Sequence, residues 1–320
     1  MPDKTKKSNP QPKKEVLVII DSNSVIHRAY HALPRLTTKK GELVNAVYGF
    51  LLVFLKAVKD FHPDFIAAAF DLPLSTFRHK KYNEYKAKRP PTPEELRSQM
   101  PIVKEFLSAF SVPIFEKEGF EADDIVGTIA QAVEKKKNVS EIIILSGDLD
   151  SLQLVSLKTK VYALKKGIKD VILYDREQVK EKFQGITPEQ ILDFKSLRGD
   201  PSDNIPGVKG IGEKTAIELL LEFGSLANIY KKIEKSPGAL KENIKELLVK
   251  DKDRAFLSKF LVQLDKNVPI DFVLENCKWL NFDIKKVTHL LEKFEFYSLI
   301  KRLAEIKKIE EPVRENLKLW

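Results

Sequence analysis

Three acidic residues near the middle of the chain have the types and spacing to hold a divalent cation. Glu121, Asp123 and Asp124 stand in a short acidic run, and the apolar periodicity after it predicts a helix that starts there. Glu121 and Asp124 then share one helix face, whereas Asp123 points roughly 100° away from Asp124. Clustered carboxylates repel one another, and their hard oxygen atoms suit Mg²⁺ or Mn²⁺. Acids also open many helices without any metal, so this run alone leaves both interpretations open.

Further aspartates follow three short apolar runs that are typical of buried parallel strands. The runs are residues 16–20, 65–70 and 141–145, and the aspartates are Asp21, Asp71 and Asp148. Helical patterns at 44–58 and 96–110 separate the runs, and this alternation predicts an α/β fold with a mostly parallel sheet. Ligands of such sheets bind beyond the carboxyl ends of the strands. We therefore expect the acids to converge at that edge.

Two more acidic pairs extend the pattern. Asp150 follows Asp148 by two residues, and in extended chain both carboxylates would point the same way. Asp200 and Asp203 form a second pair in a segment rich in Gly, Pro and Asn. Each pair taken alone fits a solvated turn equally well. Five acidic positions together, three of them at strand ends, favour a metal site.

Length, composition and charge narrow the class of protein. The chain has 320 residues, enough for roughly two domains, and its 43% hydrophobic content supports a real core. A net charge of +9 predicts a polyanionic partner, nucleic acid rather than a membrane. The single Cys277 excludes an internal disulfide and a cysteine-rich zinc site. No apolar run approaches membrane-spanning length and no signal peptide is visible, which predicts a cytoplasmic protein.

Two segments have the composition of nucleic-acid contacts. Residues 75–93 interleave cations with aromatic rings that could stack on unpaired bases, although an exposed basic loop would look the same. The candidate DNA-binding residues there are Phe77, Arg78, Tyr82, Tyr85, Lys86 and Arg89. Residues 1–15 are predicted to be a disordered basic tail.

Residues 205–216 form a glycine-rich run that feeds an apolar helix. The run nearly matches a P-loop, but Glu213 stands where that motif needs lysine and no apolar strand precedes it. We interpret it as a helix-hairpin-helix whose backbone N–H groups hold a DNA phosphate, with a plain linker as the alternative. Its candidate DNA-binding residues are Gly207, Lys209, Gly210, Gly212, Lys214 and Thr215. The Lys-rich helical pattern of residues 220–310 is expected to extend this unit.

These motifs, in this order, resemble the 5′-3′ exonuclease domain of bacterial DNA polymerase I in the flap endonuclease superfamily. The resemblance covers residues 16 to about 305. Its most specific pieces are Arg28–Leu33, Ala46–Phe50, Phe70-Asp71, Thr76–His79, Tyr85-Lys86, Glu121–Asp124, Gly147–Asp150, Gly199–Asn204 and Gly207–Ala216. Ser22 stands where the family often has Gly, and Pro73 where Lys is frequent, but neither change removes an acid.

The resemblance implies a domain plan. It comprises the tail 1–15, a PIN-like exonuclease core at 16–184 with a helical arch at about 75–98, a helical SAM-like domain with the hairpin at 185–310, and a tail at 311–320. It also implies two Mg²⁺ sites, which Mn²⁺ could fill, and K⁺ at the hairpin. Asp21, Asp71, Glu121, Asp123 and Asp124 would surround the first site, and Asp148, Asp150, Asp200 and Asp203 the second. Lys86, Arg89 and Arg78 would be the catalytic cations on the scissile phosphate.

The function implied is that of a structure-specific 5′ nuclease. Such a protein would hydrolyse DNA with a 5′ end or a 5′ single-stranded flap by a two-metal mechanism in replication and repair, and leave 5′-phosphates. We expect a monomer, either free-standing or part of a longer polymerase. Two other classes stay open: a catalytically silent branched-DNA-binding protein and a PIN-type ribonuclease. The first is disfavoured because all nine acids are present, and the second because the hairpin and the basic-aromatic segment suit branched duplex DNA.

Overall fold

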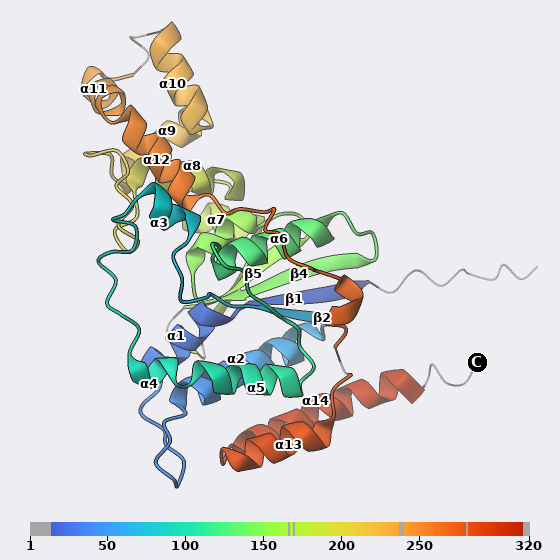
Figure 1. The fold of residues 1–320 in the computed structure, drawn as a ribbon. Helices are drawn as coiled ribbons and strands as arrows, with labels where there is room; N and C mark the ends of the chain where they lie inside the picture. The colour runs from blue at the N-terminus through green and yellow to red at the C-terminus, as the bar shows by residue number, and fades with distance from the viewer. Residues whose placement is uncertain are drawn as a thin grey trace, which may run out of the picture.

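The computed structural model describes residues 14–315 except 166, 169, 237, 239 and 280. At its centre is a six-stranded sheet in the order β3-β2-β1-β4-β5-β6, parallel except for the antiparallel β6 (Figure 1). The strands are β1 (Glu15–Asp21), β2 (Phe65–Ala69), β3 (Ile114–Phe115), β4 (Val139–Ser146), β5 (Thr159–Leu164) and β6 (Val171–Tyr174). The three apolar runs are β1, β2 and β4, so the predicted mostly parallel α/β sheet is confirmed.

Helices cover both faces of the sheet because the central strands are apolar on both sides. Leu17 and Ile19 of β1 point to the face covered by α6 (Ala122–Glu134). Val18 and Ile20, which alternate with them, point to the face covered by α1 (Ser22–Ala32) and α2 (Asn45–Phe61). α5 (Met100–Ala109) packs on α2 in the same layer. This layering fixes the carboxyl ends of β1, β2 and β4 at one edge.

The arch segment, residues 75–98, is helical only near its ends. α3 (Phe77–Lys81) and α4 (Glu94–Arg97) are short, and the residues between them form turns and irregular chain. The expected helical arch is therefore corrected. Pro90, Pro91 and Pro93 interrupt a helix here because proline lacks the amide donor, and Lys86 adopts a left-handed φ of 56°.

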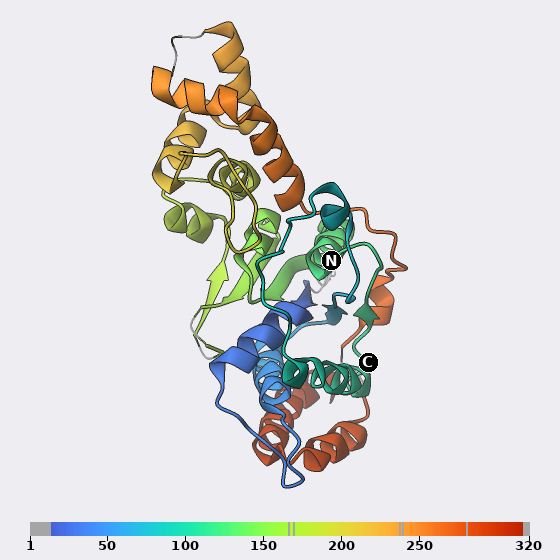
Figure 2. The same cartoon turned by 60° about the vertical axis from the view of Figure 1, so that its left-hand side comes forward.

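A helical unit extends from one end of the sheet (Figures 1 and 2). After η1 (Leu149–Leu154) and α7 (Arg176–Lys182), the unit consists of α8 (Pro188–Arg198), α9 (Glu213–Phe223), α10 (Leu226–Lys235), α11 (Glu242–Lys250) and α12 (Lys252–Val262). We call these helices the hairpin unit and residues 199–212, which join α8 to α9, the hairpin. α8 packs against both α9 and α12. The predicted C-terminal helical unit with a helix-hairpin-helix is confirmed.

The last helices do not extend the hairpin unit, so that part of the domain plan is corrected. The chain returns through η3 (Leu274–Cys277) and past β2, where Trp279 donates its backbone N–H to the carbonyl of Asp64 at 2.9 Å. α13 (Ile284–Lys293) then packs on α5, and α14 (Tyr297–Glu315) on α2, at the opposite end of the molecule (Figure 1). Their apolar face, including Leu291 and Leu299, needs the α2 and α5 layer to be buried.

The two predicted tails also need adjustment. Glu15 belongs to β1 and pairs with Val139, and α14 continues to Glu315, so the predicted tail 311–320 begins as helix. The remainder of both tails, residues 1–13 and 316–320, lies outside the described residues. Among the residues that the structure describes, no helix combines the length and the apolar character needed to span a bilayer.

Candidate active site

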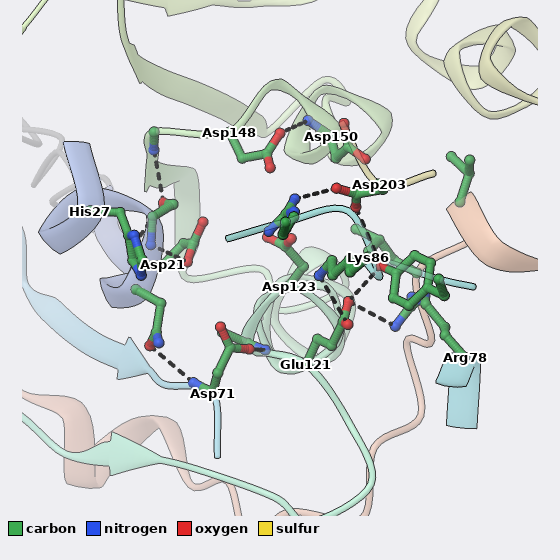
Figure 3. A pocket seen from close by; sticks show the side chains of 18 of the residues that line it. Asp21, His27, Asp71, Arg78, Lys86, Glu121, Asp123, Asp148, Asp150 and Asp203 are labelled. Carbon is green, nitrogen blue, oxygen red and sulfur yellow. Dashed lines mark hydrogen bonds and ion pairs between the residues drawn. The ribbon is translucent and has the colours of Figure 1, made fainter. Parts of the chain in front are cut away.

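A polar pocket of about 350 Å³ lies at the carboxyl edge of the sheet (Figure 3). Asp21 ends β1, Asp71 follows β2, and Asp148 follows β4, so parallel topology alone brings these three together. Seven of the nine predicted acids line this pocket, namely Asp21, Asp71, Glu121, Asp123, Asp148, Asp150 and Asp203. The expected convergence at the sheet edge is present in the structure.

The start of α6 is held by its own acids and by a neighbouring strand. Asp124 accepts a hydrogen bond from the backbone N–H of Glu121 at 3.1 Å, and Asp71 accepts one from Ala122 at 2.7 Å. A helix N-terminus leaves such N–H groups without partners and carries a partial positive charge, which favours carboxylates. These bonds leave Asp123 pointing into the pocket (Figure 3).

Asp124 and Arg78 do not occupy the positions that the sequence predicted for them. Asp124 is fully buried, does not line the pocket, and receives Arg78 N–H groups on both carboxylate oxygens at 2.7 and 2.8 Å. Arg78 is only 1% exposed and also donates to Glu121 at 3.3 Å. Arg78 reaches the edge of the pocket, but its guanidinium is committed to the protein. We therefore withdraw it as a phosphate contact and Asp124 as a metal ligand.

The acids in the pocket raise one another's pKa. Burial, together with the charges of Asp71 and Asp148, raises the pKa of Asp21 to about 6, against opposing hydrogen bonds from Ser24 and Ser146. Burial also raises the pKa of Asp123 well above its usual range, reinforced by Asp21 and Asp148. One oxygen of Asp123, Oδ1, is buried without a hydrogen-bond partner among the described residues. These carboxylates lack the neutralising partner that buried charges require.

Two cations of the arch segment neutralise the other side of the pocket. Lys86 Nζ donates to Glu121 Oε1 at 3.0 Å, and Arg89 pairs with Asp203. Although burial opposes ionisation of Glu121, Lys86 and then Arg78 hold its pKa below its usual range. The backbone N–H of Lys86 also donates to the carbonyl of Asp203 at 2.9 Å. The arch segment thus lies against the acids in this arrangement.

The donor set suits a hard divalent cation, although the ligands are not drawn together. In the described ranges, no group of three or more Asp, Glu, His or Cys side chains is placed to hold an ion as it stands. The chemistry nevertheless fits, because the lining is rich in carboxylate oxygens and Asp123 Oδ1 has no partner. A cation in the pocket would supply the neutralising positive charge that Asp21 and Asp123 lack.

The second predicted group of acids is split. Asp150 and Asp203 line the pocket, but Asp200 does not. Lys195 of α8 donates to both Asp150 and Asp200, the latter at 2.8 Å. The pair Asp148 and Asp150 does not lie in extended chain as expected. Asp148 instead caps η1 and accepts the backbone N–H of Asp150 at 3.0 Å.

The aromatic residues of the arch segment are packed rather than free to stack on bases. Tyr85 is 4% exposed and donates its hydroxyl to Glu121 Oε2 at 3.1 Å. The Phe77 ring lies 5.8 Å from the rings of Phe120 and Phe260. Tyr82 is half-buried and donates to Glu84. Tyr85 is therefore a support for the acids in this conformation, and Tyr82 packs in part against the cluster that contains Tyr85 and Leu261.

The hairpin has the geometry that its glycines suggested. Gly207 has a left-handed φ of 59°, and an added Cβ would lie 2.4 Å from the backbone nitrogen of Gly199. Gly210 also has a positive φ of 89°, whereas Gly212 caps α9 with open space around it. Lys214 has a 90% exposed side chain. The backbone N–H of Lys209 is taken by Asp251 at 2.8 Å, so its exposed side chain is what remains for a ligand.

Several residues of the pocket were not singled out from the sequence as site residues. His27 and His31 of α1 line it, together with Asn23 and Arg28. Burial, and then His31 and Arg89, lower the pKa of His27. The signal that could have found the two histidines is their i, i+4 spacing on a helix that starts directly after Asp21. Lys195 had no comparable signal, because a single lysine in a helix is usually solvated.

Comparisons with known proteins agree with this architecture. The model of the 5′-3′ exonuclease N-terminal resolvase-like domain matches residues 16–184, and that of the 5′-3′ exonuclease C-terminal SAM fold matches residues 186–285. DNA polymerase I of Bacillus subtilis (strain 168) is 43% identical over 289 residues, which are 90% of this chain and 32% of that protein. DNA polymerase I of Mycobacterium tuberculosis (strain ATCC 25618 / H37Rv) is 37% identical over 294 residues, 91% of this chain and 32% of that protein. The chain thus spans about a third of the length of these curated relatives.

Solved structures share the fold at low identity. The bacteriophage T5 D15 flap endonuclease, in a pseudo-enzyme-product complex with DNA and metal ions, has a TM-score of 0.64 and 22% identity, covering 88% of this chain and 100% of that chain. The catalytic core of Rad2 in complex with DNA substrate has a TM-score of 0.55 and 19% identity, covering 92% of this chain and 93% of that chain. At such identities these likenesses establish the fold.

Proposed function

Because this chain belongs to the 5′-3′ exonuclease family, we propose that it is a structure-specific 5′ nuclease. It would hydrolyse DNA phosphodiesters at a 5′ end or at a 5′ single-stranded flap, in replication and repair, and leave 5′-phosphates. The observation that supports this most strongly is the pocket itself. Seven acidic side chains line one cavity, with Lys86 and Arg89 at its side.

Two groups of acids would hold two divalent cations, Mg²⁺ or Mn²⁺. We assign Asp21, Asp71, Glu121 and Asp123 to the first ion, and Asp148, Asp150 and Asp203 to the second. Asp200 would act on the second only through water or by moving, because it does not line the pocket. When bound, such ions supply an activated water and stabilise negative charge on phosphoryl oxygens.

The chain's own residues would bind and orient the phosphodiester. Lys86 and Arg89 are the cations next to the acids, and each is held by a single carboxylate. A phosphate entering the pocket offers both cations another anionic acceptor, so we expect Lys86 and Arg89 to transfer to the scissile phosphate and stabilise its charge. Tyr85 would keep Glu121 in place during that exchange through its 3.1 Å hydrogen bond.

The hairpin would hold the duplex while the single strand enters the pocket. The N-terminus of α9 and the exposed lysines Lys209 and Lys214 offer backbone N–H groups and charge to a phosphate without reading bases. Thr215 would add a hydroxyl there, and we propose K⁺ as a bridging ion. We further propose that the protein acts as a cytoplasmic monomer. The chain spans about a third of the length of its DNA polymerase I relatives, and we therefore also propose a DNA polymerase domain as a partner.

The test compares three substrates under two conditions. A 5′-flap DNA, a blunt duplex of the same sequence and a structured RNA are incubated with Mg²⁺ and with EDTA, and the product ends are identified. Preferential Mg²⁺-dependent cleavage of the flap DNA to 5′-phosphate products is expected. Binding of the flap without cleavage in Mg²⁺ or Mn²⁺ would indicate a silent DNA-binding protein. Preferential cleavage of the RNA would indicate a ribonuclease.

A further inference from the structure

Arg78 and Asp124 form a buried junction between three segments that are far apart in sequence. Besides its contacts with Asp124 and Glu121, Arg78 donates to the carbonyls of Leu261 and Gln263, each at 2.8 Å. A guanidinium has five N–H groups, and these contacts use all of them. Asp124 in turn also accepts the backbone N–H of Asp265 at 2.8 Å.

The three segments that meet here are the working parts of the proposed nuclease. Arg78 lies in α3, at the base of the arch segment that carries Lys86. Asp124 lies in the first turn of α6 between Glu121 and the body of the helix, next to Asp123. Residues 261–265 are the end of α12 and the chain that leaves the hairpin unit. A movement of any one segment would have to break buried, charge-assisted hydrogen bonds.

We propose that Arg78 and Asp124 are a positioning pair, which sets the acids at the start of α6 relative to the arch segment and the hairpin unit. The catalytic role of this pair rests on the proposed nuclease function. It assigns to both residues a role different from the ligand and phosphate contacts that the sequence suggested.

The geometry explains how the pair acts through other residues. Arg78 holds Glu121 Oε2 while Lys86 holds Glu121 Oε1, so the two cations fix that carboxylate from both sides. Asp124 anchors the backbone N–H of Glu121, and this fixes the first turn from which Asp123 projects into the pocket. Neither member of the pair has a group left for a phosphate or an ion.

A double-mutant cycle tests the proposal. Arg78→Lys keeps the charge beside Asp124 but cannot make the fork of hydrogen bonds, and Asp124→Asn keeps the shape but removes the charge. At saturating enzyme and well below the unfolding temperature, each single variant should cleave flap DNA about 10²-fold more slowly, the loss typical of a misplaced catalytic constellation. The double variant should be no slower than the worse single variant. Raising Mg²⁺ or substituting Mn²⁺ should restore neither.

Hydrogen exchange gives a readout that does not depend on cleavage. In both single variants the amides of residues 121–125 and of residues 261–265 should lose protection together, since one junction protects both. The matched control is Arg35→Lys, because Arg35 makes the same fork with Glu95 at 2.7 and 2.8 Å but lies on the surface. That variant should keep wild-type cleavage and wild-type exchange.

Three outcomes would overturn the proposal that Arg78 and Asp124 act as a positioning pair. The first is that the rate losses of the two single variants add up in the double variant. The others are that high Mg²⁺ restores the cleavage rate of Asp124→Asn, as expected for a metal ligand, or that amide protection changes in only one of the two segments. A wild-type protein that cleaves no flap DNA would instead refute the proposed function. Hydrogen exchange of the variants would then still decide whether the junction couples residues 121–125 to residues 261–265.

Discussion

Asp21 should contribute a loss of stability to the metal-free protein as pH rises. Its pKa is raised from 3.8 to about 6 in the folded state because it is buried, 3% exposed, and faces Asp71 and Asp148. Between these two values the folded state binds more protons than the unfolded state, so the free energy of unfolding falls with rising pH. The stabilisation is complete below pH 3.8 and lost above about pH 6.

The magnitude follows from the shift. About two pKa units correspond to about 3 kcal/mol in total, of which about 2 kcal/mol falls between pH 4 and pH 7. Asp21→Asn cannot ionise, and it keeps one acceptor oxygen where the aspartate has one for the Ser24 backbone N–H and another for the Ser146 hydroxyl. The variant also removes one of the charges that raise the pKa of Asp123, so the pH dependence should drop by at least this amount.

The assay is denaturant unfolding in EDTA at several pH values between 4 and 7.5, for wild type and Asp21→Asn. Wild type should lose about 2 kcal/mol more than the variant over this range. Adding Mg²⁺ or Mn²⁺ should raise wild-type stability at pH 7.5 and do so much less at pH 4, because binding stabilises only the folded, ionised site. Equal pH slopes for the two proteins would refute the argument that Asp21 is buried as an unpaired acid.

Four further outcomes are expected. Lys86→Ala should lower the single-turnover rate about 10²-fold or more with little loss of duplex affinity; a rate loss explained wholly by affinity would make Lys86 a simple clamp. Asp123→Asn should stay inactive at any Mg²⁺ concentration, whereas Asp203→Asn should recover in part at high Mg²⁺ or with Mn²⁺, since Mg²⁺ needs few protein ligands; equal rescue of both would contradict the assignment to two sites. Flap binding in Ca²⁺ should weaken steeply as KCl rises to physiological levels, and a flat dependence would exclude phosphate contacts as its source. Trp279→Ala should cost about 3–5 kcal/mol of unfolding free energy because the ring packs on Phe54, unlike Tyr297→Ala on the surface, and calorimetry of both checks this.

The sequence predicted the parts of the site that follow from local pattern and parallel topology. Asp21 and Asp148 each end an apolar strand, so their meeting required only the rule that parallel strands share a carboxyl edge. Glu121 and Asp123 were placed by the start of a strongly periodic helix. The hairpin could be recognised from glycines such as Gly207, which has a positive φ and no room for a Cβ beside the backbone of Gly199.

The sequence-based predictions that were wrong depend on tertiary contacts, which no local sequence pattern encodes. Arg78 stands in a basic, aromatic segment that looks solvent-facing, yet tertiary packing buries it against Asp124. An acid next to a proposed metal ligand, such as Asp124 beside Asp123, can either bind the metal or anchor the helix start. Only the direction of its side chain distinguishes these two roles. α13 and α14 have the Lys-rich amphipathic pattern of the preceding helices, so composition alone could not reveal that their apolar face belongs to α2 and α5.

The path of the chain through the hairpin unit has a mechanical consequence. The unit leaves the sheet between α7 and α8 and returns to it at residues 263–279, so the core holds it by both ends. A unit on one tether can swing, whereas one held twice keeps its offset from the sheet. Under the proposed function, this fixed offset would set how many nucleotides separate the duplex held by the hairpin from the phosphodiester that meets the acids. We expect insertions in the return segment to shift the position of cleavage along the DNA.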